Sequence, residues 1–432
     1  MMNPDTHACP EYRELSRRGF MALTGAGLAA AAIAPACFPR VALAKDYRSS
    51  MRDVVIQVYL RGASDGLSMC VPWGDNAYYA ARPTLAVPRP DSGQANRCTD
   101  LNGFFGLAEP LLPLLPAYQD GKLLIVHATG SHDPSRSHFD AQRFMEVGKP
   151  NDPALGTGWL GRHLAGVGPM IQNPLLRGVG IATGLQRTLV GGPQTLPIPN
   201  LDTFGLTGFT TSIPSRSSAL TSLYTGAAAP LGAAATDTIN TIDLLNTIEF
   251  AGYVPAGGAV YPSGAFGLAL KQSAALIKAQ VGVEAIAIDV GGWDTHDQQG
   301  NLTGFMAGLM NTLALTLAAF YRDMTTGVAP TFSLVVMSEF GRRVAENGSA
   351  GTEHGHGNCM FVMGNCIDGG RVLANWPGLG AGQLFENRDL QVTIDYRDIL
   401  AEIVSSRMGN PNLASVFPDP AYTPVFRNVL AC

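Results

Sequence analysis

Four apolar runs along the chain predict buried strands of a parallel sheet. They are residues 53–60, 122–128, 284–288 and 331–337. Near-continuous apolar runs of this length are typical of strands whose two faces are both covered. Between the last two runs, residues 301–324 place apolar side chains at steps of three and four, which predicts an amphipathic helix. The order of strand, helix and strand indicates the crossover of a parallel sheet.

The N-terminus carries the pattern of an export signal. Residues 16–21 read Ser-Arg-Arg-Gly-Phe-Met, an apolar run follows as far as Phe38, and residues 42–44 form a small-x-small cleavage site. We therefore predict that residues 1–44 are a twin-arginine signal peptide, that the twin-arginine export machinery is a partner, and that the mature protein is periplasmic or secreted. The apolar run is alanine-rich and broken by Pro35, so it is a poor permanent anchor. The mature chain offers no second candidate span, so we expect no stable membrane span in it.

The mature chain, residues 45–432, is long enough for one large α/β domain. Within it, residues 196–280 shift towards alanine, glycine, serine and threonine with few charges, which predicts a helical insertion over the sheet. The net charge is −5 and charged residues make up only 15% of the chain. Because no basic stripe is present, we expect no nucleic-acid partner.

The cysteine count bears on the redox compartment. The mature chain has an odd number of cysteines, so in an oxidising compartment at least one thiol is unpaired or bridges two chains. The pairing stays open at this stage. The residues concerned are Cys70, Cys98, Cys359, Cys366 and Cys432.

Candidate chemistry is concentrated in a glycine-rich stretch after the run at 331–337. Residues 351–358 read Gly-Thr-Glu-His-Gly-His-Gly-Asn and place Glu353, His354 and His356 close together. Glycines let a backbone turn sharply and approach a ligand closely. Neutral imidazoles and carboxylates are the donors that divalent zinc, iron or manganese accept. The stretch is therefore a candidate metal pocket.

A second loop repeats this chemistry after residues 284–288, where Asp294 and His296 stand among glycines. Either loop alone could be a polar surface loop with incidental histidines, but the two together favour a metal site. Asp65 could add a carboxylate, because it follows the strand at 53–60 and ligands collect beyond the carboxyl ends of parallel strands. A turn aspartate is the equal alternative, since Asp-Gly favours turns.

Hydroxyl groups stand at the start of a further predicted helix. Ser135 or Ser137 could act as a nucleophile there, because a helix N-terminus stabilises anions, and Arg136 could hold the oxygens of an ester. The alternative is that the serines merely cap the helix. Glu339 and His138 are expected to orient metal ligands rather than bind the metal, although an ion pair with a nearby arginine would also explain Glu339.

A weaker signal surrounds Ser64, which stands in a Gly-x-Ser-x-Gly pattern after the first predicted strand. That pattern is typical of the nucleophile turn of serine hydrolases. Such turns normally follow several strands and lead at once into a helix, whereas here the chain runs on towards Pro72. A serine esterase that uses Ser64 is therefore the weakest alternative.

Five motifs together resemble, in chain order, those of a secreted bacterial family catalogued as domain of unknown function 1501. The motifs are Arg61-Gly-Ala-Ser-Asp65-Gly, Ser135-Arg-Ser-His-Phe-Asp-Ala-Gln142, Gly291-Gly-Trp-Asp-Thr-His296, Ser338-Glu-Phe-Gly-Arg342 and Gly351-Thr-Glu-His-Gly-His-Gly357. The family looks related to the alkaline phosphatase and sulfatase superfamily. This resemblance implies a mostly parallel central sheet with helices on both faces, and one or two divalent metals beside a hydroxyl nucleophile.

The resemblance also assigns roles to individual residues. Asp65 matches the carboxylate after the first strand, and Ser137, or else Ser135, matches the nucleophile. The acid and histidine pair in the first loop resembles the ligands of one metal, and the pair in the second loop resembles those of the other, with a final imidazole completing the set. The corresponding residues are Asp294, His296, Glu353, His354 and His356. The first pair is spaced by two residues where the phosphatases use four, and Glu353 stands where they use aspartate.

The residues and the resemblance together predict a periplasmic metal-dependent hydrolase of small anionic phosphate or sulfate esters. The cofactor would be one or two divalent ions of zinc, manganese, iron or calcium. Ser137 or a metal-bound hydroxide would attack, and Arg136 or Arg61 would steady the anion. The alternative is a secreted binding protein that keeps the scaffold without turnover.

Overall fold

The computed structural model describes residues 52–228 and 231–432, so the predicted signal peptide lies outside the described residues. Strands of the main sheet are β1 Val54–Leu60, β5 Leu123–Gly130, β6 Gly178–Ile181, β7 Thr195–Pro197, β8 Ala285–Val290, β9 Phe332–Ser338, β10 Asn358–Gly364, β11 Arg371–Leu373 and β12 Ile394–Asp395. Their order is β11, β5, β10, β9, β1, β8, β6, β7, with β12 beside β5. A small second sheet joins β2 Cys70–Val71, β3 Thr99–Asp100 and β4 Gly106–Leu107.

The main sheet is largely parallel, as the sequence predicts. β8 and β9 flank β1 and run parallel to it, and β6 runs parallel to β8. β10 departs from this pattern, because it is antiparallel to both β9 and β5. The connection from β9 to β10 contains no helix that would carry the chain across the sheet, so β10 returns in the opposite direction.

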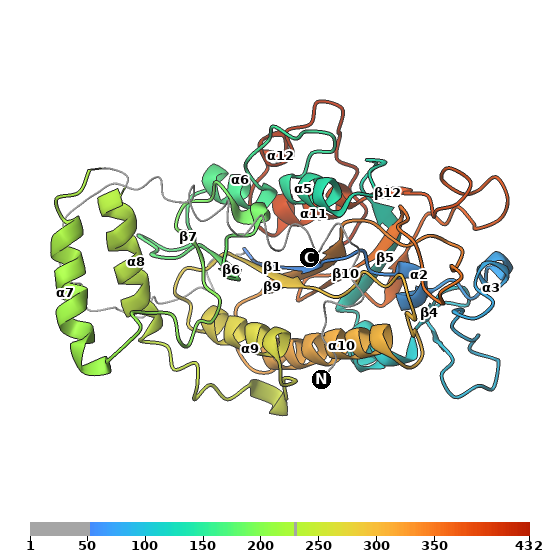
Figure 1. The fold of residues 1–432 in the computed structure, drawn as a ribbon, viewed down its shortest axis with the longest axis horizontal. Coiled ribbons are helices and arrows are strands. Elements are labelled where there is room, and N and C mark those ends of the chain that lie inside the picture. Colours follow the sequence, from blue (N-terminus) through green and yellow to red (C-terminus); the bar gives the residue numbers. More distant parts are fainter. Residues whose placement is uncertain (1–51, 229–230) are drawn as a thin grey trace.

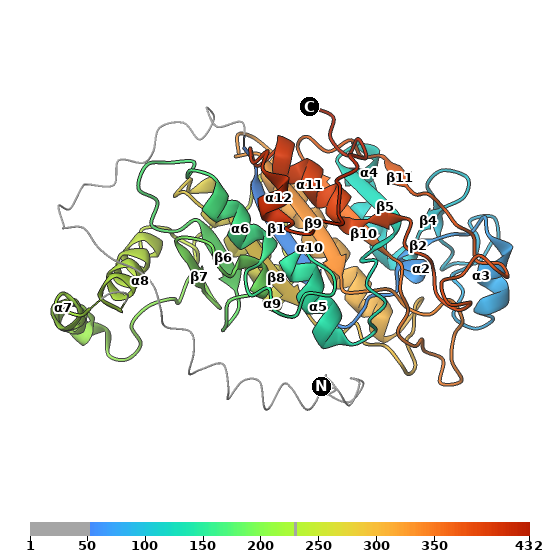
Figure 2. The same ribbon diagram turned by 90° about the horizontal axis from the view of Figure 1, so that it is seen from above.

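Helices cover both faces of the sheet (Figures 1 and 2). The α-helices are α2 Gly66–Met69, α3 Asn76–Ala81, α4 Leu115–Gln119, α5 His138–Val147, α6 Trp159–Gly166, α7 Ile213–Tyr224, α8 Leu231–Leu245, α9 Ala265–Lys278, α10 Phe305–Thr325, α11 Tyr396–Ser406 and α12 Leu413–Val416. Short 3-10 helices are η3 Glu109–Leu114, η4 Arg187–Leu189, η5 Thr210–Ser212 and η6 Ala256–Gly258. In Figure 1, α9 and α10 lie on one face of the sheet, and α5, α6 and α11 lie on the other.

Two hydrophobic cores follow from this layering. Side chains alternate along β1, so Ile56 and Val58 pack into the core that α9 and α10 cover, whereas Val55 and Tyr59 pack into the core of α6 and α11. All seven residues of β1 are buried, which explains the near-continuous apolar run in the sequence. Both faces of the central strand are therefore covered, and polar chemistry collects at the strand ends.

The predicted insertion at 196–280 divides into two parts in the structure. α7 and α8 form a pair that stands away from the sheet (Figures 1 and 2), and α7 contains no buried residue. α9 instead packs against α10, and most of its residues are buried. Among the described residues, no helix combines the length and apolar character needed to cross a bilayer.

One disulfide, between Cys366 and Cys432, ties the C-terminal residue to the loop after β10. The backbone N–H of Ala431 donates to the Cys366 carbonyl at 2.8 Å beside it. The other cysteines of the described residues, Cys70, Cys98 and Cys359, are buried free thiols. The odd cysteine count therefore resolves into one bridge and three unpaired thiols.

Candidate metal centre

The candidate site lies where loops leave the carboxyl ends of β1, β8 and β9. Arg342, which is 1% exposed, fastens these loops together. Its guanidinium donates to the carbonyls of Gly62, Ala63, Trp293 and Thr352, so one side chain satisfies backbone groups from three loops. A buried carbonyl without a partner would be costly, which makes the guanidinium a structural requirement of this pocket.

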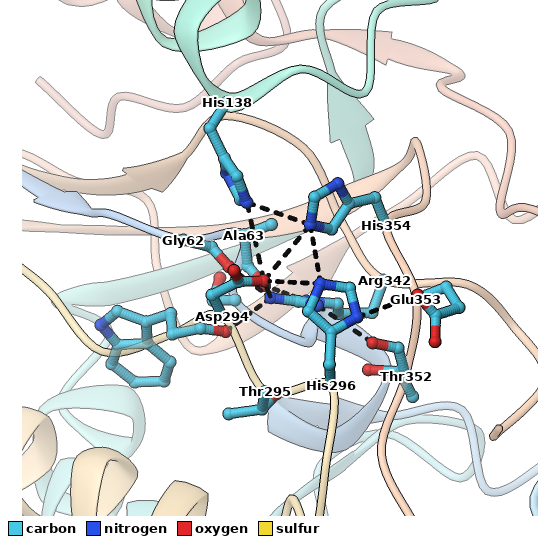
Figure 3. A network of polar contacts seen from close by, with 12 residues as sticks. Gly62, Ala63, His138, Asp294, Thr295, His296, Arg342, Thr352, Glu353 and His354 are labelled. Atoms are coloured by element: carbon cyan, nitrogen blue, oxygen red, sulfur yellow. Dashed lines mark hydrogen bonds and ion pairs between the residues drawn. The ribbon is translucent and has the colours of Figure 1, made fainter. Parts of the chain in front are cut away.

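Three imidazoles and one carboxylate converge above Arg342 (Figure 3). Nε2 of His354 lies 3.0 Å from Nε2 of His138 and 3.0 Å from Nε2 of His296. Oδ1 of Asp294 lies 3.0 Å from the His296 Nε2, 3.2 Å from that of His354 and 3.6 Å from that of His138. The ligand atoms of His138, Asp294 and His354 all lie within 4.8 Å of one another, a grouping that could hold one metal ion.

Each imidazole is oriented through its other nitrogen. Nδ1 of His138 lies 2.8 Å from the carboxylate of Glu339, and Nδ1 of His296 lies 2.9 Å from that of Glu353. Nδ1 of His354 lies 2.9 Å from the backbone carbonyl of Arg136. Carboxylates and carbonyls only accept hydrogen bonds, so the hydrogen sits on Nδ1 in all three rings. This is the arrangement that metal-binding histidines adopt.

The arrangement leaves three Nε2 atoms facing one another. In neutral rings with the hydrogen on Nδ1, each Nε2 carries a lone pair, and lone pairs repel at 3.0 Å. A cation at the centre removes this conflict, and a proton shared between rings relieves part of it. The donor set of imidazole nitrogens with one carboxylate oxygen suits zinc, iron or manganese.

The electrostatics of the metal-free chain agree with a need for positive charge. Burial lowers the pKa of His138, but hydrogen bonds to Asp294 and Glu339 outweigh burial and raise that pKa to about 9. Burial raises the pKa of Asp294, but its imidazole neighbours and Arg342 hold the pKa well below its usual range. For His354, burial dominates and lowers the pKa. The pocket thus retains a carboxylate and favours a proton on His138, but not on His354.

Exposure indicates how a small molecule would reach the cluster. The side chain of His138 is fully buried, and that of Asp294 is 6% exposed. Exposure rises to 13% at His354, 23% at His296 and 46% at Glu353. The site therefore opens to solvent on the side of His296 and Glu353.

Three predicted ligands lie outside this cluster, and one of them, Glu353, meets it only through Nδ1 of His296. Both carboxylate oxygens of Asp65 face Arg82, at 2.5 and 3.0 Å, and both side chains are fully buried. Burial raises the pKa of Asp65, but Arg82 outweighs it, so the pKa is lowered and Asp65 is a carboxylate in an ion pair. His356 stacks on Phe385, with ring centroids 4.1 Å apart, and burial lowers its pKa to about 4. Each predicted ligand is thus occupied by a partner distant in sequence.

The predicted nucleophile loop lies beside the cluster. Ser137 is the residue before α5, which begins at His138, and the Ser137 side chain does not cap the helix. The Ser135 hydroxyl accepts a hydrogen bond from the backbone N–H of Ser137 at 3.2 Å. The Arg136 guanidinium faces Asp389, 2.5 Å away, rather than an open pocket. Of this loop, the His138 ring and the Arg136 carbonyl reach the cluster directly.

The serine pattern around Ser64 has a structural explanation. Ser64 is 1% exposed, its N–H donates to the Ser338 hydroxyl, and its own hydroxyl accepts from the Asn358 amide at 3.3 Å. The hydrogen bonds of the described residues give Ser64 no imidazole partner. The Gly-x-Ser-x-Gly pattern therefore corresponds to a tight, buried loop between β1 and α2.

His138, which we expected to orient a metal ligand, instead lies with its Nε2 inside the cluster. In the sequence, the neighbouring Ser135 and Ser137 favoured a nucleophile in this segment, because a hydroxyl at the start of a helix lies where anions are stabilised. The sequence does contain a signal that groups the three histidines, because His138 follows the strand at 122–128 as His296 and His354 follow theirs. Glu339 lies 2.8 Å from Nδ1 of His138, and its role in orienting a metal ligand stays a prediction.

A family comparison supports the motif resemblance. Residues 271–410 match the family model described as "Protein of unknown function (DUF1501)". This segment belongs to the DUF1501 family. The DUF1501 segment contains Asp294, His296, Glu353 and His354, whereas His138 lies outside it. No curated protein and no solved structure matches the chain.

Proposed function

We propose that this DUF1501 protein is a metal-dependent hydrolase of phosphate or sulfate esters, built around a single divalent ion. The observation that carries the proposal is the convergence of three Nε2 atoms on the Asp294 carboxylate, with every Nδ1 held by an acceptor. The resemblance to the alkaline phosphatase and sulfatase superfamily gives the ester class. Zinc, manganese and iron fit the donor set best, because calcium prefers oxygen ligands.

The residues of the cluster would have distinct roles in binding the ion and the substrate. His138, His296, His354 and Asp294 would hold the ion, and Arg342 offsets the charge of the carboxylate through a contact of 2.7 Å. A bound divalent ion supplies a Lewis acid that polarises an ester oxygen and lowers the pKa of water. The closed side at His138 excludes solvent, and the partly exposed His296 leaves room for a substrate.

A matched pair of variants tests the metal site. His354→Gln removes an imidazole from the cluster, whereas His356→Gln removes one two residues away that stacks on Phe385. Metal content is measured by elemental analysis on protein matured through its own export route. We expect one metal ion per chain in the wild type and in His356→Gln, and loss of the ion in His354→Gln. A wild type that stays metal-free after reconstitution would refute the proposal.

Turnover is tested on the metal-loaded protein with phosphate and sulfate monoesters. If water is the nucleophile, Ser137→Ala should keep most of the activity and His354→Gln should lose it. If Ser137 attacks, Ser137→Ala should abolish turnover while metal content stays unchanged. A metal-loaded wild type that hydrolyses none of these esters would refute the hydrolase.

A second candidate is a metal-containing binding protein without turnover. One observation favours it: the arginines expected to steady an anion already face carboxylates. Arg61 contacts Glu146 and Asp289, each at 2.9 Å, and Arg136 contacts Asp389. An anionic ester would then be held chiefly by the metal. A protein that binds metal but turns over none of the esters would favour the binding protein over the hydrolase.

Export through the twin-arginine pathway is likewise a proposal. The disulfide between Cys366 and Cys432 supports an oxidising compartment such as the periplasm. Twin-arginine export also suits a protein that takes up a metal and folds before it crosses the membrane. Fusion of residues 1–44 to a reporter that is active only after folded export tests the proposal, with Arg17→Lys and Arg18→Lys as the loss-of-export control.

A further inference from the structure

A buried amide joins the two loops that carry His296 and His354. Gln299 lies in the loop after β8 and is 0% exposed. Its Oε1 accepts one hydrogen bond from the Thr295 hydroxyl at 3.0 Å and another from the Thr352 hydroxyl at 2.6 Å. Thr295 precedes His296 in the chain, and Thr352 stands two residues before His354. One oxygen atom therefore contacts both histidine loops.

The orientation of this amide is determined by its surroundings. Nε2 of Gln299 donates to Oδ2 of Asp65 at 2.7 Å and to Oδ1 of Asn301 at 2.7 Å. A carboxylate can only accept, so the NH2 group must face Asp65 and the oxygen must face the threonines. All four contacts would be lost or reversed in a flipped amide. Gln299 thus has one orientation in which its hydrogen bonds are satisfied.

The base on which the amide rests is itself fixed. Asp65 is held by Arg82 at 2.5 and 3.0 Å and by the Ser68 hydroxyl at 2.6 Å. Ser68 in turn accepts from the Asn301 amide at 2.7 Å. This network is buried throughout, and all its members except Asn301 belong to the segment after β1, so it links the two histidine loops to that segment.

Backbone hydrogen bonds also pair the two loops that carry His296 and His354. Thr352 N–H donates to the Thr295 carbonyl at 3.2 Å, and Gln299 N–H donates to the Ala350 carbonyl at 2.8 Å. These backbone bonds pair the two loops, and the hydroxyl contacts to Gln299 add side-chain bonds between them. Two hydroxyls bound to one amide oxygen resist shear between the loops, because movement of either loop breaks a buried hydrogen bond.

We propose that Gln299 is a positioning residue for the metal centre, and that Asp65 acts on the centre through Gln299 rather than as a ligand. The inference rests on the proposed metal site. Loss of the hydrogen bonds should weaken metal binding, because the ligands would no longer be held at the spacing that the ion requires. Mutation of groups that orient metal ligands typically lowers affinity by about 10- to 100-fold.

The test replaces the hydroxyls and leaves the amide in place. In the double variant Thr295→Val with Thr352→Val, shape is kept and both donors to Gln299 are lost. The double variant Thr295→Ser with Thr352→Ser keeps the hydroxyls and should rescue binding. The control is Thr316→Val in α10, since the buried Thr316 hydroxyl has no hydrogen-bond partner among the described residues.

Two readouts separate positioning from stability. Cobalt(II) affinity is measured by chelator competition together with the visible absorption of the bound ion, and the melting temperature is measured on metal-free protein. We expect the valine pair to bind cobalt about 10- to 100-fold more weakly and with an altered spectrum, while the serine pair and Thr316→Val match the wild type. Should the valine pair fold too poorly to measure, Gln299→Met tests the same oxygen.

The outcomes distinguish this inference from the proposed function. A valine pair with lower metal-free stability but wild-type affinity and spectrum would show a merely structural role and overturn the inference. In that case the metal site itself would stand. A wild type that binds no cobalt would overturn the metal site, and the positioning role would fall with it.

Discussion

A single added methyl group at Gly351 should disturb the metal centre. A Cβ built on Gly351 would lie 2.2 Å from the carbonyl oxygen of His296 and 2.3 Å from its carbonyl carbon. Both neighbours are backbone atoms, so no side chain can rotate away. Ordinary carbon contacts begin near 3.5 Å, so the loops must separate by about 1 Å in Gly351→Ala.

The displaced residue carries a candidate ligand, which sets the expected magnitude. The His296 Nε2 lies 3.0 Å from the Asp294 Oδ1 and 3.0 Å from the His354 Nε2. A shift of about 1 Å removes it from both, and overpacking of this kind costs about 1–3 kcal/mol of stability. We expect metal affinity to fall at least about tenfold, in line with other perturbations of ligand orientation.

Gly348→Ala is the matched control, because its added Cβ would have no atom within 4 Å. Both variants are compared with the wild type by cobalt(II) competition and by melting of the metal-free protein. Gly348→Ala should behave as the wild type in both assays. If Gly351→Ala equals Gly348→Ala in melting temperature and in affinity, the close approach of the two loops is not a constraint, and the reasoning fails.

Three further predictions concern other parts of the molecule. Cys366→Ser opens a bridge that spans 66 residues, and loop entropy predicts a loss of about 4 kcal/mol in urea unfolding; an unchanged midpoint would contradict it. Burial lowers the pKa of His127 to about 4 in the folded chain, whereas an unfolded histidine takes up a proton near pH 6.5. The free energy of unfolding should therefore fall by about 3 kcal/mol between about pH 6.5 and pH 4. In His127→Gln this fall should be smaller. Glu339→Gln should weaken metal binding about tenfold or more, because the bond to His138 loses its charge. Calorimetry with zinc would detect this, beside a Glu284→Gln control that removes another buried carboxylate, the partner of Arg177 just before β8.

The strands were predictable because burial on both faces leaves a strong mark in the sequence. The runs at 53–60, 284–288 and 331–337 agree with β1, β8 and β9 to within a few residues. The sequence contains no comparable signal for the antiparallel direction of β10. The apolar pattern of a strand does not depend on the direction in which the strand runs. Only the absence of a crossover helix in residues 339–357 determines that β10 runs antiparallel to β9. Fold class is therefore accessible from local pattern, whereas strand direction depends on the connection.

The site was predictable in part, for a related reason. Asp294, His296 and His354 follow strands whose carboxyl ends meet, so their positions in the sequence already implied proximity. Asp65 meets the same criterion and yet faces Arg82. What separates it from the cluster is a partner 17 residues further along, and His356 is separated in the same way by Phe385. Such pairings depend on side-chain direction, which spacing does not reveal.

The role of Arg342 shows why the rest of the pocket escaped prediction. Its guanidinium is surrounded by four backbone carbonyls and the Asp294 carboxylate. Every residue type has a backbone carbonyl, so the sequence does not show which carbonyls contact this arginine. The arginine itself is visible in the sequence, four residues after the end of β9. A cation is rarely buried without acceptors, and a buried arginine there implies that several loops turn their carbonyls inward. That same inward turn brings the histidine loops together above it.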